Sequence, residues 1–233
     1  MAVDDLYEEK LRNLRCDFEQ NKPQSILDRI RMLPSSRTLI ENNGFALLMA
    51  VIADQSVKSE IAWNLPNNLS KRIGADHFNP QWMIENNSAV QSAIAQKPAL
   101  HRFPKKISDY ILSLSFVIND HYHSADQLLH HSSDYRTFVA AIKEVSGISD
   151  KKANFLFLIL SLDFDYPFIN KEQSEALFDS HLEKWLTAYF NRKISKTEAN
   201  RICREVSPDN PALLCPYLWK LHRNEQRRLT NSK

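Results

Sequence analysis

The chain has 233 residues, of which 43% are hydrophobic and 25% are charged, and its formal net charge is +2. These ordinary values favour a globular protein with an ample hydrophobic core. Only three glycines occur, which argues against a β-sandwich or barrel with many tight turns. With neither a 20-residue apolar span nor a signal-peptide core, we expect a cytoplasmic protein that has no membrane partner.

Metal-binding and disulfide patterns are weak in this sequence. Cys16, Cys203 and Cys215 lie far apart and form no CxxC motif, so we expect buried free thiols. Four histidines, at positions 121, 123, 130 and 131, lie close together without an HExxH pattern, which predicts a solvated loop and no metal site.

Hydrophobic spacing predicts helices through most of the chain. Apolar residues at 6, 11, 14, 26, 30 and 33 predict a helical first arm that breaks at Pro34. Residues 45–53 are apolar on all sides and predict a central buried helix. The next helix, around Trp63, is expected to close at Pro66. Further helices are predicted at 107–122, 138–145, 153–162, 180–190 and 196–206.

A glycine turn joins two of these predicted helices. The segment 145–154 reads Val-Ser-Gly-Ile-Ser-Asp-Lys-Lys-Ala-Asn and precedes an apolar helix. A turn that leads into a helix N-terminus presents backbone N–H groups and the positive end of the helix dipole. With Lys151 and Lys152 following at once, the segment is a candidate anion or phosphate site.

Three segments together resemble the helix-hairpin-helix (HhH-GPD) superfamily of base-excision DNA glycosylases. The hairpin 145–153 is similar to the family's Leu-Pro-Gly-(aliphatic)-Gly-x-Lys-x-Ala pattern. Residues 47–56 resemble the family's buried helix that ends in glutamine. Residues 97–106 carry Lys97, Arg102, Lys105 and Lys106 without an acid, and resemble a bacterial subgroup of uncharacterised repair-type members.

The resemblance implies an all-α, two-lobed fold with extra helices at both ends. Residues 1–37 would form an N-terminal arm, 38–170 the glycosylase core, and 171–233 a C-terminal extension packing with the arm. The implied partner is double-stranded DNA, and the implied location is the bacterial nucleoid. No iron–sulfur cluster is expected, because the four-cysteine loop is absent. No other cofactor is implied, except for a monovalent cation that the hairpin of such proteins can hold.

Base excision requires the target nucleotide to be flipped out of the duplex, and the resemblance assigns residues to each step. Lys151 falls at the position of the nucleophilic lysine of bifunctional members, with Lys152 as the neighbouring cation or as the matching lysine itself. The catalytic carboxylate is expected near Pro167. Counting from that proline selects Glu172, with Asp165 and Asp163 as alternatives.

The resemblance also implies which residues contact DNA. Gln55 would fill the gap in the base stack, although a helix cap is the alternative for this side chain. Main-chain groups of Gly147, Ile148 and Ser149, together with Lys152, would grip a phosphate beside the lesion. The segment containing His101, Arg102 and Lys105 would face the DNA, or else pack as a turn.

Two departures from the family pattern keep a second function open. Ser149 replaces the second hairpin glycine and would need the backbone shape that glycine supplies. Ser146 replaces the proline, and no catalytic aspartate stands at the usual place. A non-catalytic DNA-binding module is therefore the alternative. A third hypothesis is an interaction protein that meets its partner through the acidic N-terminal helix.

Overall fold

The computed structural model describes residues 3–231, and side chains within 5–222. Over this part of the chain the secondary structure is helical, with one isolated β-bridge between Asp134 and Ile169 and no strand. The predicted all-α class is confirmed. No helix within the described residues is long and apolar enough to cross a membrane.

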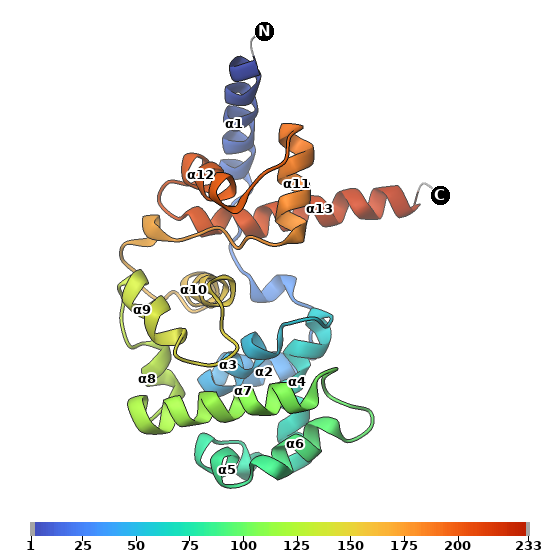
Figure 1. Cartoon of the computed structure of the whole chain (residues 1–233), viewed down its shortest axis with the longest axis vertical. Helices are drawn as coiled ribbons and strands as arrows, with labels where there is room; N and C mark the ends of the chain where they lie inside the picture. The colour runs from blue at the N-terminus through green and yellow to red at the C-terminus, as the bar shows by residue number, and fades with distance from the viewer. Residues whose placement is uncertain (1–2, 232–233) are drawn as a thin grey trace. The chain divides into compact units, whose positions relative to one another are not determined.

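Most helices follow one another with short connections, whereas longer segments join α1 to α2 and α10 to α11 (Figure 1). Their bounds are α1 (Val3–Gln20), α2 (Pro34–Asn42), α3 (Gly44–Ala53), α4 (Ser59–Ile73), α5 (Pro80–Glu85), α6 (Asn87–Ala95), α7 (Pro104–Val117), α8 (Ala125–Leu129), α9 (Tyr135–Ile142), α10 (Asp150–Asp163), α11 (Ser180–Phe190), α12 (Lys196–Val206) and α13 (Leu214–Asn231). A π-helical turn, Ile118–Tyr122, continues α7.

Two compact units share these helices. The first unit comprises residues 1–26, 134–136 and 157–233, and the second comprises 27–133 and 137–156. Both units are therefore assembled from segments that are far apart in the sequence, and the division falls within α10.

The second unit is built around α3. All residues from Phe45 to Ala53 are buried, as the apolar run predicts, and α3 packs against α2, α4 and α7. Asn43 begins this helix, because its side chain accepts a hydrogen bond of 3.0 Å from the backbone N–H of Ala46. A helix with no polar face must be surrounded by other elements, and this one is.

Two prolines behave differently from the sequence-based expectation. Pro34 does not break a helix but occupies the first turn of α2, where its missing N–H would have no intrahelical partner anyway. Pro66 does not close α4, which continues to Ile73. Buried Leu65 and Leu69 flank this proline, so packing of α4 against α3 outweighs the local cost of an interior proline.

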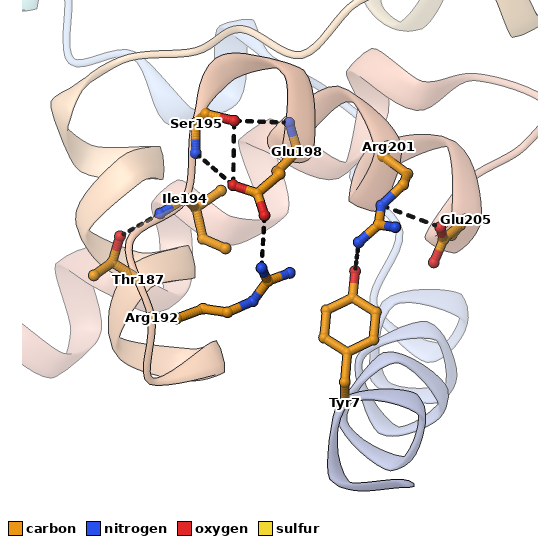
Figure 2. Close-up of polar contacts among 8 residues, drawn as sticks. All are labelled: Tyr7, Thr187, Arg192, Ile194, Ser195, Glu198, Arg201 and Glu205. Carbon is orange, nitrogen blue, oxygen red and sulfur yellow. Dashed lines mark hydrogen bonds and ion pairs between the residues drawn. The ribbon is translucent and has the colours of Figure 1, made fainter. Parts of the chain in front are cut away.

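The first unit joins the N-terminal helix to the C-terminal ones, and α1 packs against α11 and α12. Figure 2 shows one of these contacts, in which Arg201 donates a hydrogen bond of 3.1 Å to the hydroxyl of Tyr7. The guanidinium groups of Arg192 and Arg201 lie 5.1 and 5.4 Å from the centre of the Tyr7 ring. Cation–π contacts of this kind hold α1 against α12, through Arg201, and against the α11–α12 connection, through Arg192.

The predicted helices 180–190 and 196–206 are confirmed with the same bounds. The start of α12 is a capping box (Figure 2): Ser195 accepts from the backbone N–H of Glu198, whose carboxylate accepts from the backbone N–H of Ser195 at 3.0 Å. These bonds and Arg192 hold the pKa of Glu198 below its usual value. The box is therefore intact at neutral pH and weakens as pH falls through that lowered pKa.

Replacing Ser195 with alanine should remove the cap of α12 and lower the free energy of unfolding by about 1 kcal/mol. Urea denaturation followed by circular dichroism measures the change. Thr197→Ala is the matched control, since Thr197 is exposed on the first turn of the same helix. Equal stability of the two variants would contradict a stabilising role for the cap.

Candidate functional site

The predicted hairpin connects α9 to α10 and rests on α7. Gly147 has a φ of +89°, and a β-carbon there would lie 2.7 Å from Cε2 of Tyr110. Ser113, also on α7, accepts a hydrogen bond of 3.0 Å from the backbone N–H of Ser146. Glycine is therefore required at position 147 for two reasons: the backbone is left-handed, and a β-carbon would overlap the Tyr110 ring.

The backbone amides of this hairpin are only partly available to a phosphate. The N–H of Ile148 donates to the carbonyl of Val145 at 3.2 Å, so this amide is engaged within the hairpin. The amides of Gly147 and Ser149 have no hydrogen-bond partner among the described residues. An anion at the hairpin could be held by these two donors.

Ser149 stands where the resembling family has a glycine, but its backbone φ is not positive. It therefore does not adopt a glycine-like conformation. Its carbonyl instead accepts the hydrogen bond of 2.9 Å from Ala153 that opens α10. A serine is suited to this helix-capping place. The departure from the family pattern therefore causes no backbone strain here.

The amine of Lys152 joins the hairpin to the end of α3. Its Nζ donates to the carbonyl of Ile52 at 2.7 Å and to that of Gly147 at 2.9 Å. The last carbonyls of an α-helix lack intrahelical partners, so this amine satisfies one end of the buried helix and one side of the hairpin together. Two segments that the sequence predicted to contact DNA thus meet at one nitrogen.

Burial lowers the pKa of Lys152 to about 8, from an ordinary value of 10.5. Asp54 acts in the opposite direction, whereas Lys106 and Lys151 lower the pKa further. About one amine in ten is then neutral at pH 7. A neutral amine has two N–H groups and one lone pair, so the two carbonyls satisfy its donors and leave the lone pair unused. Lys152 thus meets the chemical requirement for a nucleophilic lysine.

Lys151 lies one residue earlier on α10 and is exposed. Its amine is therefore not withdrawn from water, and its positive charge lowers the pKa of Lys152. Adjacent residues on a helix are rotated by about 100°, so only one of two neighbouring lysines can face the core. That residue is Lys152.

A carboxylate and an indole complete the end of α3. Asp54 accepts a hydrogen bond of 3.0 Å from Nε1 of Trp63, which holds it near Lys152. Gln55 donates from its side chain to the carbonyl of Ile52 at 3.3 Å, so in this structure it has the alternative role of a helix cap. The sequence analysis did not select Asp54, although an acid directly after an apolar helix could have suggested it.

His101 lies inside the second unit, with only 1% of its surface exposed. Its Nδ1 accepts from the backbone N–H of Phe103 at 3.1 Å, so its Nε2 carries the proton and donates to the carbonyl of Ala53 at 3.2 Å. Burial lowers the pKa of this imidazole, which keeps it neutral. Its side chain therefore positions the 101–103 segment and has no nitrogen left for DNA.

The neighbouring basic residues are placed differently. Arg102 and Lys105 are exposed, and the Arg102 guanidinium lies 5.3 Å from the ring centre of Phe103, which is 41% exposed. Arg72, which the sequence analysis did not select, holds this loop by donating to the carbonyls of Gln96 and Pro98 at 2.8 and 2.7 Å. The loop thus presents an aromatic ring and two cations.

The candidate carboxylates belong to the first unit, whereas both lysines belong to the second. Glu172 is exposed in a short 3₁₀ turn, and Asp165 is exposed with a φ of +51°. Asp163 is engaged, because its carboxylate accepts hydrogen bonds from the Ser25 hydroxyl and from the backbone N–H of Ile26. The cluster around Lys152 is formed without any of the three.

Comparisons of the chain with protein-family models, curated proteins and solved structures find no match. Within residues 5–222, no three histidine, cysteine, aspartate or glutamate side chains are grouped so that they could hold a metal ion. The function is therefore inferred from the geometry of the second unit and from the resemblance of its three segments.

Gly147→Ala should destabilise the protein more than Gly74→Ala. Both glycines have positive φ, but a β-carbon at Gly74 meets only His77 at an ordinary 3.6 Å. Strain alone should cost about 1–2 kcal/mol at Gly74, and the overlap with Tyr110 should add to it at Gly147. Urea denaturation compares the variants. In a Tyr110→Ala background, Gly147→Ala should cost no more stability than Gly74→Ala. A larger cost for Gly147→Ala in that background would contradict the overlap.

Labelling of the Lys152 amine by reductive methylation should follow a titration with a midpoint near pH 8, read by mass spectrometry of its peptide. Asp54→Asn should move this midpoint to lower pH, because the carboxylate raises the pKa of the amine. Lys106→Met should move it to higher pH, because the neighbouring cation lowers that pKa. Shifts in the same direction for both variants would refute the electrostatic account.

Proposed function

We propose that this protein is a DNA glycosylase that also has lyase activity, acting on a damaged or modified base in duplex DNA. The observation that supports this most directly is the amine of Lys152, which bonds to both the end of α3 and the hairpin. Base excision through an imine requires a lysine amine that can act as a nucleophile beside the segments that hold the DNA. Lys152 lies between two segments that are predicted to contact DNA.

In the proposed reaction the neutral Lys152 amine attacks C1′ of the flipped nucleotide. The C1′–N bond breaks, its electron pair leaves with the base, and the base is then protonated. The attacking nitrogen loses a proton, the C1′–O4′ bond then breaks as O4′ takes up a proton, and the nitrogen's electron pair forms a protonated imine with C1′. Removal of a C2′ proton expels the 3′ phosphate and cleaves the strand. The assignment of Glu172 or Asp165 as the carboxylate that stabilises positive charge on the sugar comes from the resemblance alone.

Positive charge supports a DNA partner. Arg102, Lys105 and Lys106 lie at the start of α7, and Lys151 lies at the start of α10, all within the second unit. Phosphate contacts by such residues carry no sequence information but supply affinity that falls steeply with salt. The amides of Gly147 and Ser149 add two neutral donors for the same backbone.

A non-catalytic DNA-binding module is the second candidate. It is favoured by the two hydrogen bonds of Lys152, which are also those of a purely structural helix cap. The same charges and hairpin would then bind DNA without excision.

Borohydride trapping on duplexes carrying abasic, uracil, oxidised or alkylated sites tests the enzyme. A covalent protein–DNA adduct is expected with wild type and Lys151→Met. At least a hundredfold less adduct is expected with Lys152→Met. An adduct that disappears only in Lys151→Met would assign the nucleophile to Lys151 instead.

Base release without any adduct would indicate a monofunctional enzyme, in which Glu172→Gln or Asp165→Asn should abolish release. Salt-dependent binding without adduct or base release on any duplex would favour the module. Absence of DNA binding at low salt would reject both candidates. Circular dichroism of each variant establishes that loss of adduct does not come from unfolding.

A further inference from the structure

Two histidines of the first unit face each other across a helix pair. His181 stands in the first turn of α11, and His222 stands on α13, which packs against α11. Their Nδ1 atoms are 3.3 Å apart, and their ring centres are 5.1 Å apart at an interplanar angle of 64°. Neither residue belongs to the segments proposed to act on DNA.

The facing nitrogens have the separation of two metal ligands. A tetrahedral ion with metal–nitrogen bonds of about 2.0–2.1 Å holds two donor nitrogens about 3.3 Å apart. Without an ion, one ring must carry its proton on Nδ1 and donate to the other. With an ion, both Nδ1 lone pairs converge on it and each Nε2 carries the proton, so a metal fits the same placement without rearrangement of the helices.

The surroundings determine which kind of ion could bind. Imidazole nitrogen suits Zn²⁺, Cu²⁺ and Ni²⁺, whereas Mg²⁺ and Ca²⁺ require oxygen ligands. The nearby Asp179 carboxylate caps α11 by accepting from the backbone N–H groups of His181 and Leu182 at 3.0 and 2.9 Å. His181 is exposed, so an ion can enter from solvent and water can complete its coordination.

We propose that His181 and His222 form a two-histidine site for a divalent transition-metal ion of the Zn²⁺ class, which links α11 to α13. This site is independent of the proposed action on DNA. With two protein ligands the site should bind more weakly than a four-ligand structural zinc site. The ion would stabilise the folded first unit, because the unfolded chain does not hold the two rings together.

Titration calorimetry of the full chain with ZnCl₂ at pH 7.5 tests the site, with Cys16→Ser as the background because Cys16 is an exposed thiol. One Zn²⁺ per chain is expected, and His181→Ala or His222→Ala should weaken binding at least tenfold. His131→Ala is the matched control, since His131 is an exposed histidine of the other unit, and it should bind like the background. MgCl₂ should not bind.

The thermal midpoint and the ring ¹⁵N signals provide independent readouts. Saturating Zn²⁺ should raise the midpoint by about 5 °C or more in the background and leave it unchanged in both histidine variants. The Nδ1 signals of His181 and His222 should shift together on addition of Zn²⁺. Zn²⁺ binding that persists in both variants, or that is lost equally in His131→Ala, would overturn the proposal. So would affinity no greater than that for Mg²⁺.

Discussion

The second unit depends on how the C-terminal carbonyls of its buried helix are satisfied. Helix α3 has no polar face, so its last carbonyls emerge among packed elements, where an unpaired oxygen is costly. Lys152 from α10 bonds to one of them and His101 from the loop before α7 bonds to the next. The requirement for these donors brings three segments, at 47–56, 97–106 and 145–154, to one place. Each was singled out by sequence alone, but no local pattern states that they meet.

The same interaction connects stability with chemistry. The Lys152 amine caps α3 and is partly withdrawn from water. This burial lowers its pKa, so a fraction of the amine is neutral and carries a lone pair. Gly147 belongs to the same arrangement, because its carbonyl accepts from this amine while its missing side chain admits the ring of Tyr110. A structural cap and a reactive nucleophile are therefore compatible descriptions of Lys152, and the proposed function uses both.

The first unit is organised by a different kind of contact. Its N-terminal helix is held by the hydrogen bond from Arg201 of α12 to Tyr7 (Figure 2) and by cation–π contacts of the Tyr7 ring with Arg192 and Arg201. Helix α12 starts at a complete capping box. The facing rings of His181 on α11 and His222 on α13 add a further contact, with their Nδ1 atoms 3.3 Å apart. Long-range pairs of this kind join chain ends that are almost 200 residues apart, since Tyr7 and Arg201 are separated by 194 positions.

The sequence by itself determined the helical class, the buried character of α3 and the bounds of α11 and α12, because hydrophobic periodicity and local caps are properties of neighbouring residues. It did not determine that α4 continues through Pro66, since the packing that outweighs a proline lies elsewhere in the chain. Nor did it reveal that Ser149 needs no left-handed backbone, or which of Lys151 and Lys152 is buried. Only the tertiary structure decided these points: the direction of a side chain on a helix, and the acceptors that surround it, depend on elements distant in sequence. The electrostatic partner Asp54 and the pairing of His181 with His222 became visible for the same reason.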